Sequence, residues 1–372
     1  MRKRFKLKIY GKSPRSLILA YVLAQFNCDV YILDLLIKSN KNNDYQIFLF
    51  SNFLKNLLVN FEIWNEIEDI SYCFNSLIFN DYLLFEKLLL KKEILSDKYL
   101  NTFGWTAKYS EIKSLLIKKL NNLDNVHFIS KNQLIEESLN FDFEFNFKSC
   151  DEYPLSNFKK TDNQSIIFNA YLRGNVDKRL YEINTNNGLL ILTPINKYLY
   201  QIIWNNAPIQ INERSLSSKS FFLDNLTIML PDELKIDEII GDINFFNVNN
   251  ISSTYLIKKK SVFFNENKFK SNILYEFEFD MVIRNIIQIF NFLENNETKI
   301  ILILNRIGLY YLYRKCINFK IKFSFTKFLI NLFIFNNIFL LFIRKLLFNL
   351  FKRTNLIKFY IIKNLTNVHF KI

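Results

Sequence analysis

Four small or acidic residues near the start of the chain have the types and the spacing of a dinucleotide-binding turn. The stretch KLKIYGKSPRSLILAYVLAQFNCDVYILD contains an apolar run, a turn, a helix-like segment and a second apolar run. In a dinucleotide-binding βαβ unit, three glycines allow a tight turn and a close approach to the pyrophosphate, and an acid after the second strand binds the ribose. The corresponding residues here are Gly11, Ser13, Ser16 and Asp34.

Only the first of the three glycines is present, and two interpretations stay open. Ser13 and Ser16 are small, but each has a Cβ that hinders a close approach of the backbone to a phosphate. Gly11 and Asp34 keep the spacing of a βαβ unit, and Arg15 could contact a phosphate. These residues by themselves fit a nucleotide site and a plain βαβ unit that binds nothing.

The elements around this turn predict an α/β domain. Short apolar runs over 5–10 and 29–34 read as buried strands that flank a helix over 15–26. YSEIKSLLIKKLNNL (109–123) places Ile112, Leu115, Leu116 and Leu120 on one face and predicts an amphipathic helix, and a strand follows at 125–130. Strands that alternate with helices in this way indicate a parallel sheet.

The pattern changes in the middle and again near the end of the chain. From about 155 to 260, strand-like runs such as SIIFNAYL and GLLILTPI alternate with polar turns and predict an antiparallel sheet. Beyond 279, the run DMVIRNIIQIFNFL opens a region predicted to be helical to the end of the sequence.

The composition restricts the chemistry that side chains can supply. Half of the 372 residues are hydrophobic, which is enough for a large core. The four cysteines are scattered without a CxxC pair and there are two histidines, so we expect no metal site and no histidine-based catalytic dyad. The basic start MRKR leads into a strand-like segment instead of a signal-peptide cleavage site, so a cytoplasmic location is expected.

Charge is distributed unevenly along the chain. The net charge is +14, yet residues 301–372 contain 13 Lys and Arg and no Asp or Glu. Within this basic region, FLINLFIFNNIFLLFI (328–343) is apolar but short for a transmembrane helix. The segment fits an interfacial helix with cations at anionic headgroups, or a helix buried on the core. Nucleic-acid binding is not expected, because no reading motif accompanies the charges.

Several longer stretches match one family in the same order along the chain. IYGKSPRSLILA stands where that family has its Gly-rich turn, and DVYILD stands at its second strand. YEINTNNGLLILTPINKYLYQIIWNNAP (181–208) matches its substrate-domain strands, and VFFNENKFKSNILYEFEFDMVIRNIIQIFNFL (262–293) matches its second FAD segment. On these stretches the chain resembles the flavin-dependent aromatic hydroxylases of ubiquinone biosynthesis, relatives of para-hydroxybenzoate hydroxylase.

The resemblance implies which residues would bind FAD: Gly11, Ser13, Ser16, Asp34, Gln46, Glu266 and Asp280. Gln46 stands where the family has an arginine, and the family's Gly-Gln-Gly-Leu-Asn loop is replaced by the acidic stretch 276–280. Of the family's FAD-contacting glycines, Gly11 alone remains, which predicts weak FAD binding or none. No side chain is predicted to be catalytic, because in this family the flavin carries the chemistry.

The resemblance also implies a fold and a domain organisation. The expected class is α/β, with a Rossmann-like FAD-binding domain, an inserted and mainly antiparallel β-sheet substrate domain, and a helical, basic C-terminal region. The predicted ranges are 1–155 with 255–300 for the discontinuous FAD-binding-like domain, 156–254 for the substrate-type β domain, and 301–372 for the C-terminal region.

Two functions follow from the resemblance and stay open. One is a divergent FAD-dependent monooxygenase that hydroxylates the ring of a polyprenyl phenol or quinol, with NAD(P)H or another electron donor. The other is a non-catalytic relative that has lost FAD and serves as a scaffold or partner of quinone-biosynthesis proteins. In both cases the C-terminal region is expected to contact a membrane surface, with the protein peripheral on the inner face of the membrane.

Overall fold

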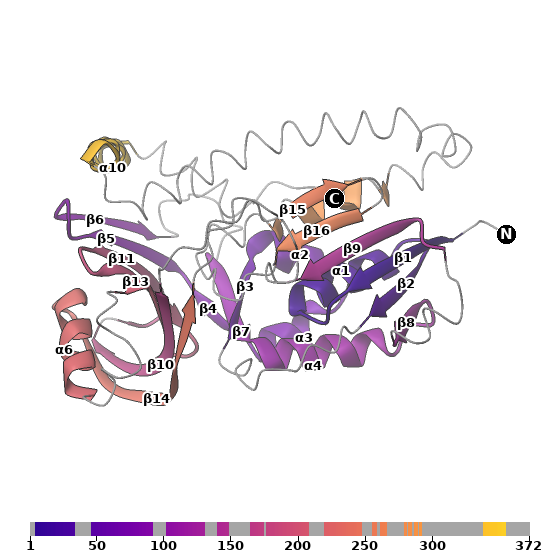
Figure 1. The fold of residues 1–372 in the computed structure, drawn as a ribbon, viewed down its shortest axis with the longest axis horizontal. Coiled ribbons are helices and arrows are strands. Elements are labelled where there is room, and N and C mark those ends of the chain that lie inside the picture. The colour runs from indigo at the N-terminus through magenta and orange to yellow at the C-terminus, as the bar shows by residue number, and fades with distance from the viewer. Residues whose placement is uncertain are drawn as a thin grey trace.

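We describe the fold from a computed structural model of the chain (Figure 1). The structure describes residues 4–33, 46–91, 102–130, 140–148, 164–174, 176–207, 219–247, 255–258, 261–265, 279–280, 282–284, 286–288, 290–291 and 338–354. Three sheets organise these residues, and helices cover the first and second of them.

The first sheet has six strands and contains the predicted βαβ unit. Across the sheet the strands are β15 (Tyr255–Lys258), β16 (Ser261–Asn265), β9 (Phe143–Lys148), β1 (Phe5–Tyr10), β2 (Cys28–Leu33) and β8 (Val126–Ile129). All neighbouring pairs are parallel except β15 and β16. The predicted Rossmann-like parallel sheet is therefore confirmed.

Helix α1 (Pro14–Ala24) follows β1 and is almost entirely buried. It packs against α4 (Tyr109–Leu120), which turns Ile112, Leu116 and Leu120 inward as their spacing predicted. Helices α2 (Asn52–Asn60) and α3 (Trp64–Asp69) add Leu57 and Trp64 to the same core. The core of this part therefore lies between the parallel sheet and its helices.

A small antiparallel sheet stands between the two larger ones. Its strands are β3 (Ile47–Ser51), β7 (Gly104–Lys108) and β4 (Tyr72–Phe74), in that order. The hydroxyl of Thr106 on β7 donates a hydrogen bond to the carbonyl of Pro194, which belongs to the second large sheet. This contact joins the two main parts of the molecule.

The second large sheet has seven strands. In order they are β14 (Leu234–Asn247), β10 (Gln164–Gly174), β13 (Leu199–Ala207), β12 (Gly188–Pro194), β11 (Arg179–Thr185), β5 (Ser76–Asp81) and β6 (Glu86–Lys91). All neighbours are antiparallel except β5 and β11. Helix α6 (Lys219–Met229), which the sequence patterns did not predict, covers one face through Phe222 and Leu226.

Strands β5 and β6 come from the range predicted for the FAD-binding-like domain, yet β5 pairs with β11 of the second large sheet and β6 pairs with β5 at its edge. The predicted domain ranges stay a prediction, but the second sheet draws strands from both sides of residue 155. Figure 1 shows this hairpin at the outer edge of the sheet, away from β1 and β2.

After β16, the structure describes two further helical segments. Residues of 279–291 are helical where described, and Ile283 and Phe290 join the core of the first sheet. Helix α10 (Ile338–Arg353) packs against β6 at the edge of the second sheet. Within the described residues, no helix combines the length and the apolar character needed to cross a bilayer.

Candidate functional site

The turn between β1 and α1 requires glycine at its first position. Gly11 has a φ of +110°, and a Cβ built on it would lie 2.8 Å from the carbonyl oxygen of Phe147 on β9. A side chain at this position is excluded by both the backbone conformation and the close neighbour. The glycine that the sequence retains is therefore the one that this turn depends on.

The two serines that replace the other glycines are turned toward their own helix. Ser13 is the N-cap of α1, and its Oγ accepts the backbone N–H of Ser16 at 3.1 Å. The Ser16 hydroxyl lies 3.0 Å from the carbonyl oxygen of Gly11 and 2.8 Å from that of Ser13, to which it can donate. Both side chains are buried, so neither hydroxyl projects from the turn.

This capping reduces the number of backbone N–H donors that the N-terminus of α1 has for binding an anion. A helix N-terminus binds a phosphate through its first backbone N–H groups. Pro14 has no N–H, and the N–H of Ser16 is donated to Ser13. Two of the first three amides of α1 are thus unavailable to a phosphate.

Two cations stand at the same turn. The ammonium of Lys12 lies 5.4 Å from the centre of the Phe128 ring, and the guanidinium of Arg15 lies 5.8 Å from that of Phe279. Phe279 precedes Asp280, which is completely buried. The structure therefore brings Asp280 from the helical segment 279–291 to the same end of the core as Gly11, Ser13 and Ser16.

One turn of helix after Asp280, Arg284 is held in an apolar setting. Its guanidinium lies 4.0 Å from the centre of the Phe53 ring. Burial lowers the pKa of Arg284 to about 10, and the carboxylate of Asp280 partly opposes that change. The two residues form a charge-compensated patch beside the turn.

The remaining predicted FAD residues are not all placed. Gln46 precedes β3, and its backbone carbonyl accepts the N–H of Tyr109 at the start of α4 (2.8 Å). Asp34 and Glu266 lie outside the described residues. Within the described residues, no group of three His, Cys, Asp or Glu side chains could hold a metal ion.

A second candidate site lies on the face of the seven-stranded sheet that is turned away from α6. Strand alternation places Tyr181 and Ile183 toward α6, so Glu182 lies on the opposite face. The apolar part of this face is a buried cluster of Ile167, Leu189, Ile191 and Ile203. We call it the Glu182 face.

Buried polar atoms border the apolar cluster of the Glu182 face. Within the described part of the chain, Oε1 of Glu182, Oγ1 of Thr193 and Oδ1 of Asn169 are buried and have no hydrogen-bond partner. Glu182 is paired in register with Ile191, whereas Thr193 and Asn169 each lie opposite Gln201 on β13. Such atoms are costly to leave unpaired and are suited to the polar groups of a ligand.

Burial controls the protonation of Glu182. Because water is excluded, the charged form is disfavoured and the pKa of Glu182 is raised to about 8. At neutral pH the side chain is then a neutral carboxylic acid, which can donate a hydrogen bond as well as accept one.

The Glu182 face reaches the junction between the sheets. Thr193 precedes Pro194, whose carbonyl accepts the hydrogen bond from Thr106 of the small sheet.

The sequence patterns did not single out this second site. Glu182 stands within the YEINTNNGLLILTPI match, and an acid between apolar residues in a strand usually faces water. One pattern in the sequence could have indicated the buried face. Strands β12 and β13 have apolar residues at successive positions, which is typical of a sheet covered on both faces.

Comparison with known proteins defines the class of fold. No protein-family model matches the chain, and neither does any curated protein. Among solved structures, p-nitrophenol 4-monooxygenase PnpA from Pseudomonas putida has a TM-score of 0.66 and 10% identity, with 99% of each chain covered. HpxO from Klebsiella pneumoniae, complexed with FAD, has a TM-score of 0.59 and 9% identity and covers 98% of this chain and 99% of its own.

A third similar structure is PqsL from Pseudomonas aeruginosa, a probable FAD-dependent monooxygenase. Its TM-score is 0.56 at 9% identity, with 89% of this chain and 95% of PqsL covered. At such low identity the similarity establishes the fold. The chain has the mixed α/β fold of FAD-dependent monooxygenases of the p-hydroxybenzoate hydroxylase type.

Proposed function

We propose that the protein is a divergent FAD-dependent monooxygenase that hydroxylates an electron-rich ring, with NAD(P)H or another electron donor as reductant. The observation that carries the proposal is the combination, in one monooxygenase fold, of the Gly11 turn with a buried apolar face bordered by polar atoms. PnpA and HpxO, which share this fold, support both the cofactor and the reaction class.

The residues of the turn are compatible with FAD. Gly11 keeps the tight turn, and the hydroxyls of Ser13 and Ser16 are buried against their own helix. With two helix amides unavailable, Lys12 and Arg15 would supply the positive charge that a pyrophosphate needs. We expect an FAD affinity lower than that of a three-glycine turn.

When bound, FAD would supply the activation of O2 and the transfer of oxygen to the ring. The chain itself would bind and orient the substrate and exclude water. On the Glu182 face, the aliphatic cluster would contact the ring, and Glu182 and Thr193 would hydrogen-bond to its oxygen substituents. A neutral Glu182 would donate a hydrogen bond to a hydroxyl or carbonyl oxygen of the ring without placing a charge in this apolar region.

For the substrate, we propose a polyprenyl phenol or quinol of ubiquinone biosynthesis, handled by a protein that is peripheral on the inner face of a membrane. The resemblance along 181–208 and 262–293 supports this substrate class. A polyprenyl chain resides in the bilayer, so an enzyme acting on it requires a surface that contacts lipid. Other quinone-biosynthesis proteins are further candidate partners.

A specific observation favours a second candidate function. Pro14 and the capped amide of Ser16 remove phosphate-binding donors from α1. A chain that has lost FAD altogether would be a non-catalytic scaffold or partner of quinone-biosynthesis enzymes, with the fold retained.

Flavin binding separates the two functions. Purified protein should show the absorbance bands of oxidised flavin, or its melting temperature should rise when FAD is added. Gly11→Ala should abolish either signal. Gly174→Ala should not, although its Cβ would lie only 1.9 Å from the carbonyl oxygen of Glu233, because Gly174 lies at the end of β10 and away from the turn. A colourless wild-type protein whose melting temperature is unchanged by millimolar FAD would rule out the monooxygenase and leave the scaffold.

A further inference from the structure

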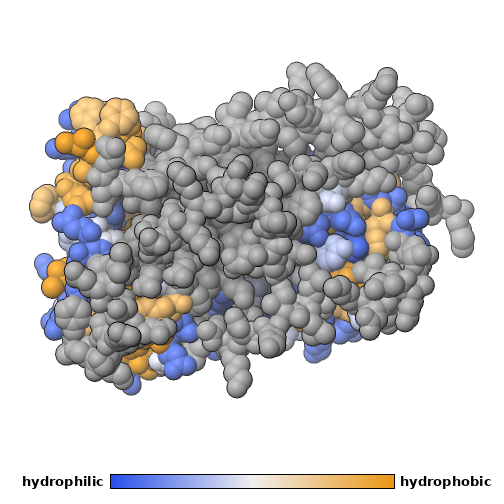
Figure 2. Space-filling model, in the orientation of Figure 1, coloured by the Kyte–Doolittle hydropathy of each residue, from blue (hydrophilic) through white to orange (hydrophobic). Residues whose placement is uncertain are grey.

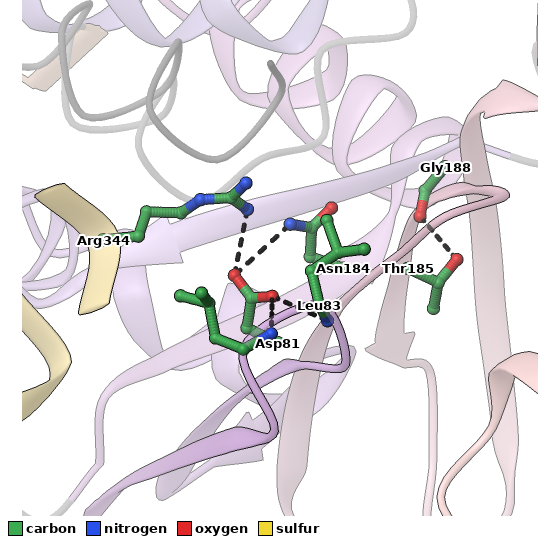
Figure 3. Close-up of polar contacts among 7 residues, drawn as sticks. Asp81, Leu83, Asn184, Thr185, Gly188 and Arg344 are labelled. Carbon is green, nitrogen blue, oxygen red and sulfur yellow. Dashed lines mark hydrogen bonds and ion pairs between the residues drawn. The ribbon is translucent and has the colours of Figure 1, made fainter. Parts of the chain in front are cut away.

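Helix α10 is attached to the protein body by charged side chains. Arg344 is completely buried, and its Nη1 lies 2.9 Å from Oδ2 of Asp81 on β5 (Figure 3). Nearer the end of the helix, Lys352 forms an ion pair with Glu86 on β6. Phe348, on the same side of the helix as Arg344, is also buried.

The outward face of α10 is apolar, which is the reverse of an ordinary surface helix. Phe339 and Phe342 are 67% and 61% exposed, and Leu346 and Leu350 are each 47% exposed. Their spacing of three and four residues places them in one stripe along the helix. In Figure 2 this stripe is the concentration of hydrophobic surface at the upper left, where Figure 1 places α10.

A residue from another element extends this surface. Phe85, in the turn between β5 and β6, is 93% exposed and has a φ of +54°. Positive φ is unfavourable for a bulky side chain, so the turn presents a phenyl group to the outside at a conformational cost. Its neighbour Glu86 pairs with Lys352, which places Phe85 beside the end of α10.

The charges on α10 indicate what covers the apolar stripe. The helix has four cations and no acidic residue. Arg344 and Lys352 point to the body, whereas Lys345 and Arg353 are exposed with the stripe. An apolar stripe flanked by cations complements the interface of an anionic bilayer, where headgroups pair with cations and acyl chains cover the apolar side chains.

We propose that the outward face of α10, together with Phe85, lies in the surface of an anionic lipid bilayer and holds the protein there. At 16 residues the helix is about 24 Å long, so it lies in the interface plane and does not span the membrane. The proposal specifies the location part of the proposed function, and it does not depend on FAD binding.

The test is co-sedimentation of the full-length protein with vesicles of phosphatidylcholine, with and without one quarter phosphatidylglycerol. Wild-type protein should bind the anionic vesicles, release them as salt rises and bind pure phosphatidylcholine weakly. The double variant Phe342→Glu/Leu346→Glu should lower partitioning at least about tenfold, because it removes two inserted side chains and adds two negative charges. Ile228→Glu on α6, where the side chain is 77% exposed, is the matched control and should bind as wild type does.

Several results would overturn the proposal. They are failure of the wild type to bind anionic vesicles, equal loss of binding in the control, and a stripe variant that binds undiminished. A change of oligomeric state in the double variant without lipid would assign the stripe to a second copy of the chain instead. Flavin absorbance measured on the same samples keeps this outcome separate from the fate of the FAD proposal.

Discussion

The guanidinium of Arg344 on α10 lies 2.9 Å from the carboxylate of Asp81 on β5, and both side chains are buried. Oδ1 of Asp81 accepts hydrogen bonds from the backbone N–H groups of Leu83 and Leu84, at 3.1 and 3.2 Å. Oδ2, which faces Arg344, also lies 3.4 Å from the side-chain amide nitrogen of Asn184 (Figure 3). Burial lowers the pKa of Arg344, and the carboxylate of Asp81 opposes that change. The pair thus joins the C-terminal helix to the edge of the second sheet.

Replacing one partner of this pair should be costly. Arg344→Met leaves the buried Asp81 carboxylate without its counter-charge and should lower the free energy of unfolding by about 3 kcal/mol. Denaturant titration measures the loss, and proteolysis of α10 detects local detachment. Lys352→Met, which breaks a partly exposed ion pair, should cost less than about 1 kcal/mol.

A double substitution then separates charge from packing. Arg344→Met/Asp81→Asn removes both charges and should recover most of the stability lost in the single variant. If the double variant is as unstable as Arg344→Met, the contribution of Arg344 comes from its packing and not from the ion pair.

Gly11→Ala should destabilise the first sheet. The new Cβ would meet the carbonyl oxygen of Phe147 in a backbone conformation that alanine disfavours, at a cost of roughly 1–3 kcal/mol. Denaturant titration is again the measurement. An unchanged unfolding midpoint would show that the turn adopts another conformation in solution.

Ser13→Gly tests whether capping limits flavin binding. Glycine at an N-cap costs only a few tenths of a kcal/mol relative to serine, and the change releases the N–H of Ser16 for a phosphate. FAD should therefore bind more tightly to this variant, as measured by fluorescence titration or by the rise in melting temperature. Ser114→Gly on α4 is a control away from the turn, and its FAD affinity should match the wild type.

Glu182 should make stability depend on pH. Its pKa is raised from 4.5 in the unfolded chain to about 8 in the fold, so the folded state binds more protons in between. Stability is fully present below pH 4.5 and falls as pH rises toward 8, by up to about 1.4 kcal/mol per pH unit. In Glu182→Gln this decline should disappear, as measured by denaturant titration across the same range. Parallel curves for the two proteins would show that Glu182 is solvated or paired in solution.

Local patterns in the sequence were sufficient for the βαβ unit of the first sheet and for β8, but not for β9. The strand, turn and helix around Gly11 and the inward stripe of α4 follow from short-range periodicity and from residues that tolerate few backbone conformations. The predicted class, a Rossmann-like sheet with a mainly antiparallel second sheet, is confirmed for the same reason.

Other features depend on contacts between distant residues, and sequence patterns do not encode these. The parallel pairing of β5 with β11 joins segments about a hundred residues apart, and neither strand indicates its partner. Glu182 is buried because both faces of its sheet are covered, although alternation in one strand suggests exposure. The outward apolar stripe of α10 contradicts the usual assumption that a helix turns its apolar face inward.

The Arg344–Asp81 pair also affects the order in which parts of the fold can form while the chain is being synthesised. Asp81 leaves the ribosome 263 residues before Arg344, so β5 and β6 remain without this counter-charge until that length of chain has been made. Domains tend to fold as they emerge, N-terminal parts first. Helix α10 therefore attaches after β5 and β6 have been made, and its apolar stripe is presented only from that point on.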